Sequence, residues 1–234
     1  HGARFHMKEI IELAEKLNAP VLTTFKGKGQ ISDAHPLAGG VLGRSGTPIA
    51  SWFMNESDVI LVFGASFSKH TGITPKKKII QVDFDPMALS KFHKIEVSLY
   101  GHIEITVNLL IDQLKEKTPL VDSKSEIAER WVIWRAEKVK RLKEDKGNGI
   151  SSIKAITTFS NLVEENAVIA LDVGNNTYSF GRYFECKNQS MLMSGYLGSI
   201  GFALPAAMGA WAAVKGQRPV WSFSGDGGLG QYLA

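Results

Sequence analysis

The sequence contains only one cysteine, Cys186, among its 234 residues. A single thiol excludes an intramolecular disulfide and a metal site built from several cysteines. No apolar run approaches the ~20 residues that a membrane-spanning helix needs. The first residues, His1 to Arg4, lack the apolar stretch of a secretion signal. We therefore expect no membrane association and a cytoplasmic location.

Strong charge of one sign is also missing. The chain has 27 Lys and Arg against 23 Asp and Glu, a net charge of +4. The only basic run, 76–78, leads into an expected strand, where a solvated loop is the ordinary interpretation. Without a basic stripe the sequence predicts no nucleic-acid binding. Metal-ligand spacing is likewise absent from four histidines, His35, His70, His93 and His102. We expect them at loop or surface positions.

What the sequence does contain is an alternation of helical and strand patterns. Residues 7–17 place apolar side chains on one helical stripe, and short apolar runs at 21–24, 58–64 and 79–83 read as buried strands. Such alternation predicts an α/β fold with a doubly wound, mostly parallel sheet. We assign residues 1–117 to this first, nucleotide-binding-like domain.

Residues 118–150 differ in character, because Trp131 and Trp134 stand among Lys, Arg and Glu. We interpret them as a linker with one amphipathic helix, which packs onto its own domains or, alternatively, binds a partner. A second α/β unit covers 151–234, with a strand at 168–172 and another at 220–224. Both ends of the chain are expected to lie inside domains.

The last predicted strand runs into a Gly-Asp-Gly-Gly turn at 225–228. Such a turn delivers one carboxylate, that of Asp226, at the carboxyl edge of a sheet, and its glycines let backbone amides approach a phosphate. Because Mg²⁺ prefers carboxylate and phosphate oxygens, Asp226 is a candidate magnesium ligand. An ordinary Asp-Gly turn is the alternative.

Three segments together make the pattern specific: Asp172-Val173-Gly174, the glycine-spaced loop and helix start at 194–207, and the turn at 225–228. In order and spacing they resemble the diphosphate-binding domain of thiamine-diphosphate enzymes of the acetolactate synthase, pyruvate oxidase and pyruvate decarboxylase family. Residues 1–117 resemble the central domain of that family through, for example, 23–29 and 58–64. The resemblance covers nearly the whole chain and fades only across about 118–150.

This resemblance implies thiamine diphosphate and Mg²⁺ as cofactors. Asp226 would bind the metal, the Gly198 carbonyl would contact the aminopyrimidine, and Ile200 would support the bent form of the cofactor. Many relatives have serine where this chain has Gly228. Asn175 and Asn176 could contact the cofactor or cap a helix. The implied cofactor-binding set is Gly174, Asn175, Asn176, Gly198, Ser199, Ile200, Asp226, Gly227 and Gly228.

The resemblance places no catalytic residue on this chain. The family's glutamate lies upstream of His1, and the second metal ligand of the Gly-Asp-Gly motif lies beyond Ala234. We therefore expect these 234 residues alone to be inactive. In relatives the central domain holds FAD or ADP or is empty, so the resemblance makes FAD a possible further cofactor. The replacement of the synthases' arginine by Ser66 argues against flavin binding. The possible nucleotide-binding residues are Gly43, Gly64, Ala65, Asp83 and Asp85.

The expected parent enzyme acts on a 2-oxo acid, pyruvate first, by decarboxylation and carboligation to acetolactate. Pyruvate oxidase or pyruvate decarboxylase chemistry is an alternative, and so is a noncatalytic nucleotide-binding module. Because relatives build each active site between two subunits, a homodimer or homotetramer is expected.

Overall fold

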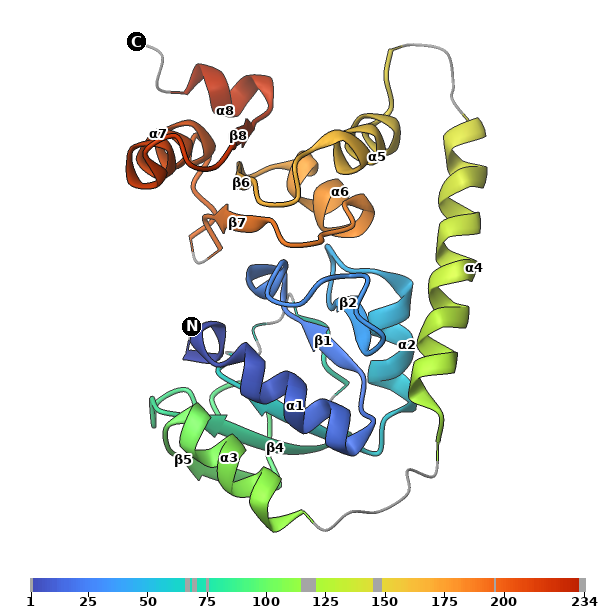
Figure 1. The fold of residues 1–234 in the computed structure, drawn as a ribbon, viewed down its shortest axis with the longest axis vertical. Coiled ribbons are helices and arrows are strands. Elements are labelled where there is room, and N and C mark those ends of the chain that lie inside the picture. The colour runs from blue at the N-terminus through green and yellow to red at the C-terminus, as the bar shows by residue number, and fades with distance from the viewer. Residues whose placement is uncertain are drawn as a thin grey trace.

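The computed structural model describes residues 2–65, 68, 71–74, 76–114, 121–144, 149–195 and 197–231. Over these residues the chain is α/β and every strand pair is parallel, which confirms the predicted fold class. Two α/β halves follow one another along the chain, and the long helix α4 (Ser123–Lys143) lies beside both of them (Figure 1). No helix of the described part is long and apolar enough to cross a membrane.

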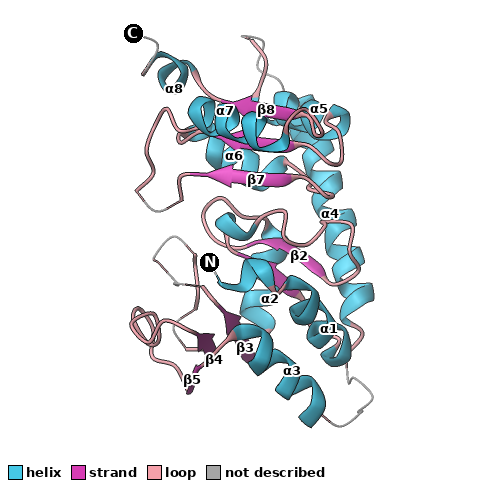
Figure 2. Cartoon of the chain, turned by 60° about the vertical axis from the view of Figure 1, so that its left-hand side comes forward, coloured by secondary structure: helices cyan, strands magenta, loops and turns pink. Residues whose placement is uncertain are grey.

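The first half contains a two-stranded sheet, β1-β2, and a three-stranded sheet, β3-β4-β5, seen among their helices in Figure 2. Its elements are η1 (Gly2–Phe5), α1 (Met7–Leu17), β1 (Val21–Thr23), η2 (Phe25–Gly27), β2 (Ala38–Val41), α2 (Pro48–Glu56), β3 (Val59–Phe63), β4 (Lys78–Asp83), β5 (Val97–Tyr100) and α3 (Ile103–Gln113).

The second half is built on the sheet β7-β6-β8. Strand β6 lies in the middle and pairs in parallel with both neighbours, so the carboxyl ends of all three strands lie along one edge of the sheet. Its elements are α5 (Ser152–Leu162), β6 (Val168–Leu171), α6 (Asn175–Tyr183), β7 (Ser190–Met193), α7 (Ala203–Val214), β8 (Val220–Phe223) and α8 (Asp226–Gly230).

Helix α1 shows how local sequence fixes an element. Ile10, Leu13 and Ala14 fall three and four residues apart, so they share one face, and all three are buried. The helix ends at Asn18, whose left-handed backbone (φ 48°) lets its N–H donate to carbonyls of the last turn. Helix α2 begins with Thr47, whose hydroxyl accepts from the Ala50 N–H, followed by Pro48 in the first turn.

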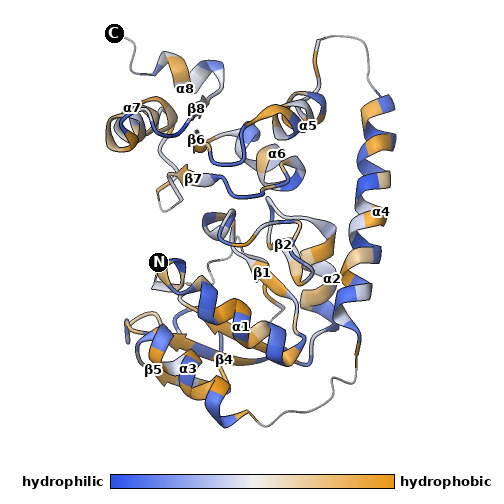
Figure 3. Cartoon of the chain, in the orientation of Figure 1, coloured by the Kyte–Doolittle hydropathy of each residue, from blue (hydrophilic) through white to orange (hydrophobic). Residues whose placement is uncertain are grey.

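Helix α4 packs onto the chain's own domains, as one of the two interpretations of residues 118–150 predicted. Apolar and charged residues alternate along it (Figure 3), and Ile127, Trp131 and Trp134 are buried against α1, β1, β2 and α2. The Trp131 indole Nε1–H donates to the Ala38 carbonyl at 2.8 Å. The predicted domain boundary at 117/118 lies outside the described residues. The predicted boundary at 150/151 falls immediately before Ser151, the N-cap residue of α5.

The basic run at 76–78 matches the expected solvated loop at two of its three lysines and differs at the third. Lys76 and Lys78 are exposed, but Lys77 Nζ donates to the carbonyl oxygens of Asn55 and Ser57, the latter at 2.7 Å. Since the last carbonyls of a helix have no partner within it, Lys77 stabilises the end of α2.

The two halves are joined by a buried polar contact. The Asp33 carboxylate, in the loop before β2, accepts the Cys186 N–H at 2.6 Å, and the Asp33 N–H donates to the Cys186 carbonyl at 2.7 Å. Lys28 lies 3.2 Å from the same carboxylate, and only 3% of its side chain is exposed. Burial raises the pKa of the Cys186 thiol to about 11, so this cysteine is neutral at physiological pH.

Glu185, which follows α6 in the second half, forms ion pairs with two residues of α4. Its carboxylate receives a bidentate hydrogen bond from Arg135, with Nη2 at 2.8 Å, and a further one from Lys138. Burial by itself raises the pKa of Glu185, but these charged donors outweigh it, so the pKa lies below the usual glutamate range.

The lowered pKa predicts a pH dependence of stability. A carboxylate with a folded-state pKa below its unfolded value stabilises the fold above the unfolded pKa, about 4.3 for glutamate, and this stabilisation disappears as the pH falls through the folded value. Glu185→Gln should therefore cost more stability at pH 7 than at pH 3. Urea unfolding of both proteins at the two pH values measures this, and an equal cost at both would contradict the ion-pair account.

Candidate functional site

The carboxyl edge of the sheet β7-β6-β8 brings together the three segments that carry the predicted diphosphate site. Residue 172 follows β6, the loop 194–201 lies between β7 and α7, and the turn 224–228 follows β8. In parallel sheets this edge is where ligands bind, because the loops that follow the strands meet there.

Asp172 links the three segments directly. Its Oδ1 accepts the N–H of Val173 at 2.7 Å and of Gly201 at 2.9 Å, and its Oδ2 accepts the Ser224 hydroxyl at 2.7 Å. Only 1% of Asp172 is exposed. A buried carboxylate is tolerated when it is fully hydrogen-bonded, so Asp172 fixes the positions of all three turns.

Gly228 packs against this carboxylate. A Cβ at this position would fall well inside contact distance of Asp172 Oδ2 and 2.7 Å from Ser224 Oγ. The serine that many relatives carry therefore does not fit here unless Asp172 or Ser224 moves. The position is occupied by glycine because the backbone of α8 approaches the buried acid closely.

Residues 197–200 of the loop before α7 are exposed to solvent. Gly198 (φ 68°) and Gly201 (φ 86°) adopt the left-handed backbone that favours glycine, and the Ser199 N–H donates to the Ser194 hydroxyl at 3.0 Å. Ile200, between the two glycines, is 48% exposed although aliphatic. Its side chain is therefore available to a ligand at this edge.

The turn after β6 contains a donor without a partner. Asn176 Oδ1 accepts the Thr177 N–H at 2.9 Å, while Asn176 Nδ2 is buried and makes no hydrogen bond. The residue at the N-cap of α6 is Gly174 (φ 146°), so neither Asn175 nor Asn176 occupies that position, although Asn176 Oδ1 satisfies one backbone N–H of the first turn. A buried amide donor without a partner is costly, and an anionic oxygen would satisfy it.

Asp226 lies at the first position of α8, immediately after Gly225, and it is exposed. Gly227 is exposed as well, and a Cβ there would meet nothing within 4 Å. An accessible carboxylate, an unpaired amide and an exposed glycine loop at one sheet edge form a donor set that suits Mg²⁺ and a diphosphate. The residues present therefore fit thiamine diphosphate, with Asp226 for the metal and Asn176 for a phosphate oxygen.

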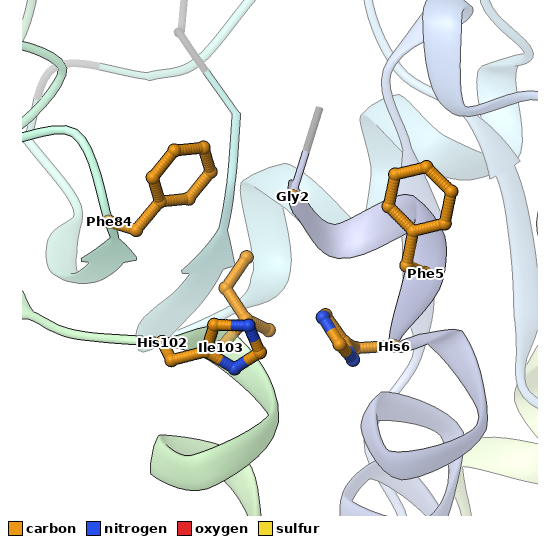
Figure 4. Close-up of a pocket in the computed structure, with 6 residues that line it drawn as sticks. All are labelled: Gly2, Phe5, His6, Phe84, His102 and Ile103. Atoms are coloured by element: carbon orange, nitrogen blue, oxygen red, sulfur yellow. The ribbon is translucent and has the colours of Figure 1, made fainter.

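Residues predicted to hold a nucleotide lie at two separate places. Gly64 follows β3, Asp83 is the last residue of β4, and Asp85 lies two residues further on. Between the two aspartates, Phe84 lines a cavity of about 260 Å³ at the carboxyl edge of β3-β4-β5 (Figure 4). Gly43 instead lines a second cavity of about 200 Å³ together with Arg182.

The two aspartates form local turns. Asp83 Oδ1 accepts the Asp85 N–H at 3.0 Å and Asp85 Oδ1 accepts the Met87 N–H at 2.9 Å. These oxygens are thus engaged within the protein. Ala65 accepts a hydrogen bond from Gln81 through its carbonyl. Two further residues considered at this place, Ser66 and His70, lie outside the described residues.

Sequence comparison agrees with the site. Residues 1–110 match the family described as "Thiamine pyrophosphate enzyme, central domain", and residues 172–234 match "Thiamine pyrophosphate enzyme, C-terminal TPP binding domain". The chain belongs to the thiamine pyrophosphate enzymes.

Within that family the chain is similar to acetolactate synthase large subunits. It is 33% identical to a probable large subunit from Methanococcus aeolicus over 95% of this chain and 40% of the relative, and 32% identical to the isozyme 1 large subunit of Escherichia coli over 93% and 39%. A putative thiamine pyrophosphate-containing protein of Bacillus subtilis, YdaP, is 27% identical over 99% and 40%. The chain spans about two fifths of the length of these curated relatives.

Two features of the site could not be found from sequence patterns. Asp172 was recognised as part of a motif, but its partners Gly201 and Ser224 lie 29 and 52 residues away. The unpaired Asn176 amide is likewise visible only when its surroundings are known.

Proposed function

We propose that this chain forms part of a thiamine-diphosphate enzyme that acts on a 2-oxo acid, with pyruvate as the first candidate and carboligation to acetolactate as the leading reaction. The observation that carries the proposal is the set of three turns tied together by Asp172, with Asp226 exposed beside them. The names of the most similar relatives support the acetolactate synthase form.

The residues of this chain would bind and orient the cofactor. Asp226 would hold Mg²⁺, Gly227 and Gly228 would offer backbone to the diphosphate, and Asn176 would donate to a phosphate oxygen. The Gly198 carbonyl would accept the aminopyrimidine amine, and Ile200 would fill the space under the bent cofactor. When bound, thiamine diphosphate supplies the electron sink for loss of CO₂ from a 2-oxo acid.

Product analysis separates the candidate reactions. The protein, together with the flanking regions that its relatives possess, is incubated with pyruvate, thiamine diphosphate and Mg²⁺. Acetolactate is the expected product, whereas acetaldehyde or acetate would indicate decarboxylase or oxidase chemistry instead. Absence of any turnover despite cofactor binding would favour the noncatalytic nucleotide-binding module.

Three further properties stay predictions. FAD is one, because the cavity at the carboxyl edge of β3-β4-β5 lies where nucleotides bind in such sheets. Flavin absorbance of the purified protein tests this prediction. A homodimer or homotetramer and a cytoplasmic location are the others.

A further inference from the structure

Two histidines far apart in the sequence meet at the mouth of the first half's cavity. His6 precedes α1 and His102 precedes α3, and these two helices pack against each other. The imidazole rings lie edge to face, with centroids 4.7 Å apart. Figure 4 shows both rings lining the cavity, opposite Phe84 and Phe5.

A carboxylate completes the group. Glu104, in the first turn of α3, places Oε2 3.4 Å from His6 Nδ1. One ligand atom from each of His6, His102 and Glu104 lies within 4.8 Å of the others. Around a tetrahedral zinc ion with bonds of about 2.0–2.1 Å, neighbouring ligand atoms are separated by about 3.4 Å. The His6–Glu104 pair already has this spacing, and a ring nitrogen of His102 lies within 4.8 Å of both ligand atoms.

We propose that His6, His102 and Glu104 form a binding site for a divalent transition-metal ion, of which Zn²⁺ is the representative. Two imidazoles and one carboxylate suit Zn²⁺, Co²⁺ or Ni²⁺, whereas Mg²⁺ and Ca²⁺ prefer all-oxygen ligands. Glu104 does not line the cavity and the two imidazoles do. The ion would thus sit at the cavity edge, held by three protein ligands, with its open position toward the cavity.

The site is separate from the proposed diphosphate site. It belongs to the carboxyl edge of β3-β4-β5, whereas Asp226 and Asp172 belong to the edge of β7-β6-β8. A bound ion would join the beginnings of α1 and α3, so metal binding should also stabilise the first half by binding only its folded form.

Isothermal titration of the tag-free protein with ZnCl₂ at pH 7.5 tests the proposal. We expect one ion per chain at this site, and at least a tenfold loss of affinity in His102→Ala and in Glu104→Gln, both of which change exposed side chains. His35→Ala is the matched control, because His35 also pairs with a glutamate, Glu15 at 3.5 Å, but has no third ligand among the described residues. Its affinity should equal that of the wild type.

Two further measurements make the outcome decisive. Since imidazole must be deprotonated to bind a metal, affinity should fall steeply at pH 5.5. Co²⁺ should give the visible absorption of a low-symmetry site in the wild type and lose it in His102→Ala. Equal Zn²⁺ affinity in the wild type and in both site variants, with all proteins folded by circular dichroism, would overturn the proposal.

Discussion

Asp172→Ala is expected to lower the free energy of unfolding by about 3 kcal/mol or more and to abolish binding of thiamine diphosphate. The substitution leaves three donors without their acceptor: the N–H groups of Val173 and Gly201 and the Ser224 hydroxyl. Each buried donor that loses its partner costs roughly 1–3 kcal/mol. Because this carboxylate hydrogen-bonds to all three turns, the ligand edge should lose its arrangement together with the stability.

Asp172→Asn separates the two effects. The amide keeps an oxygen for the two backbone donors and offers an N–H to Ser224 Oγ, so the loss of stability should be about half or less. Denaturant unfolding measures the stability, and titration with thiamine diphosphate and Mg²⁺ measures the binding. Asp112→Ala, which removes an exposed carboxylate at the end of α3, should change neither. A stable, fully binding Asp172→Ala protein would contradict the role of this residue.

Asp33→Ala is expected to destabilise the junction between the two halves by about 3–5 kcal/mol. Removing one member of a buried ion pair leaves the other charge uncompensated, here the nearly fully buried Lys28 ammonium. The Cys186 N–H loses its acceptor in the same step. Stability is measured by urea unfolding monitored by tryptophan fluorescence.

A double-mutant cycle identifies the cause of that loss. If the unpaired ammonium dominates, adding Lys28→Met to Asp33→Ala should recover much of the stability that Asp33→Ala loses alone. Glu165→Ala is the matched control, because it breaks the exposed Lys187–Glu165 pair and should cost less than about 1 kcal/mol. If Asp33→Ala and Glu165→Ala lowered the free energy of unfolding by similar amounts, burial of the Lys28–Asp33 pair would have no special effect.

Some elements could be predicted because their sequences carry strong local patterns. Helix α1 was expected at 7–17 and has those bounds, since an apolar stripe precedes Asn18 and Pro20. Strands β3, β4, β6 and β8 were expected within one or two residues, because each is a compact apolar run that ends at a turn residue or an acid.

Other elements were missed because tertiary contacts define them. Strand β2, with the sequence Ala-Gly-Gly-Val, carries no strand pattern of its own, yet all four residues are buried and the strand pairs with β1. Strands β5 and β7 lack a strong apolar alternation and form by pairing with β4 and β6.

Site residues divide in the same way. The Gly-Asp-Gly-Gly turn could be placed at a sheet edge because it directly follows a strand pattern. The contacts of Asp172 and the meeting of His6 with His102 could not, because they join residues that only the packing of separate elements brings together. The histidines show no metal-ligand spacing in the sequence. Spacing along the chain, however, gave no information about which histidines lie close together in the fold.

The affinity for thiamine diphosphate, measured with and without Mg²⁺, tests the central claim most directly. The protein with the flanking regions of its relatives should bind the cofactor only when Mg²⁺ is present, and Asp226→Ala should weaken that binding about 100-fold or more, since even outer-shell changes at metal sites cost 10–100-fold. Asp58→Ala, which removes another exposed carboxylate, should bind as the wild type does. Unchanged Mg²⁺-dependent binding in Asp226→Ala would contradict the proposed site.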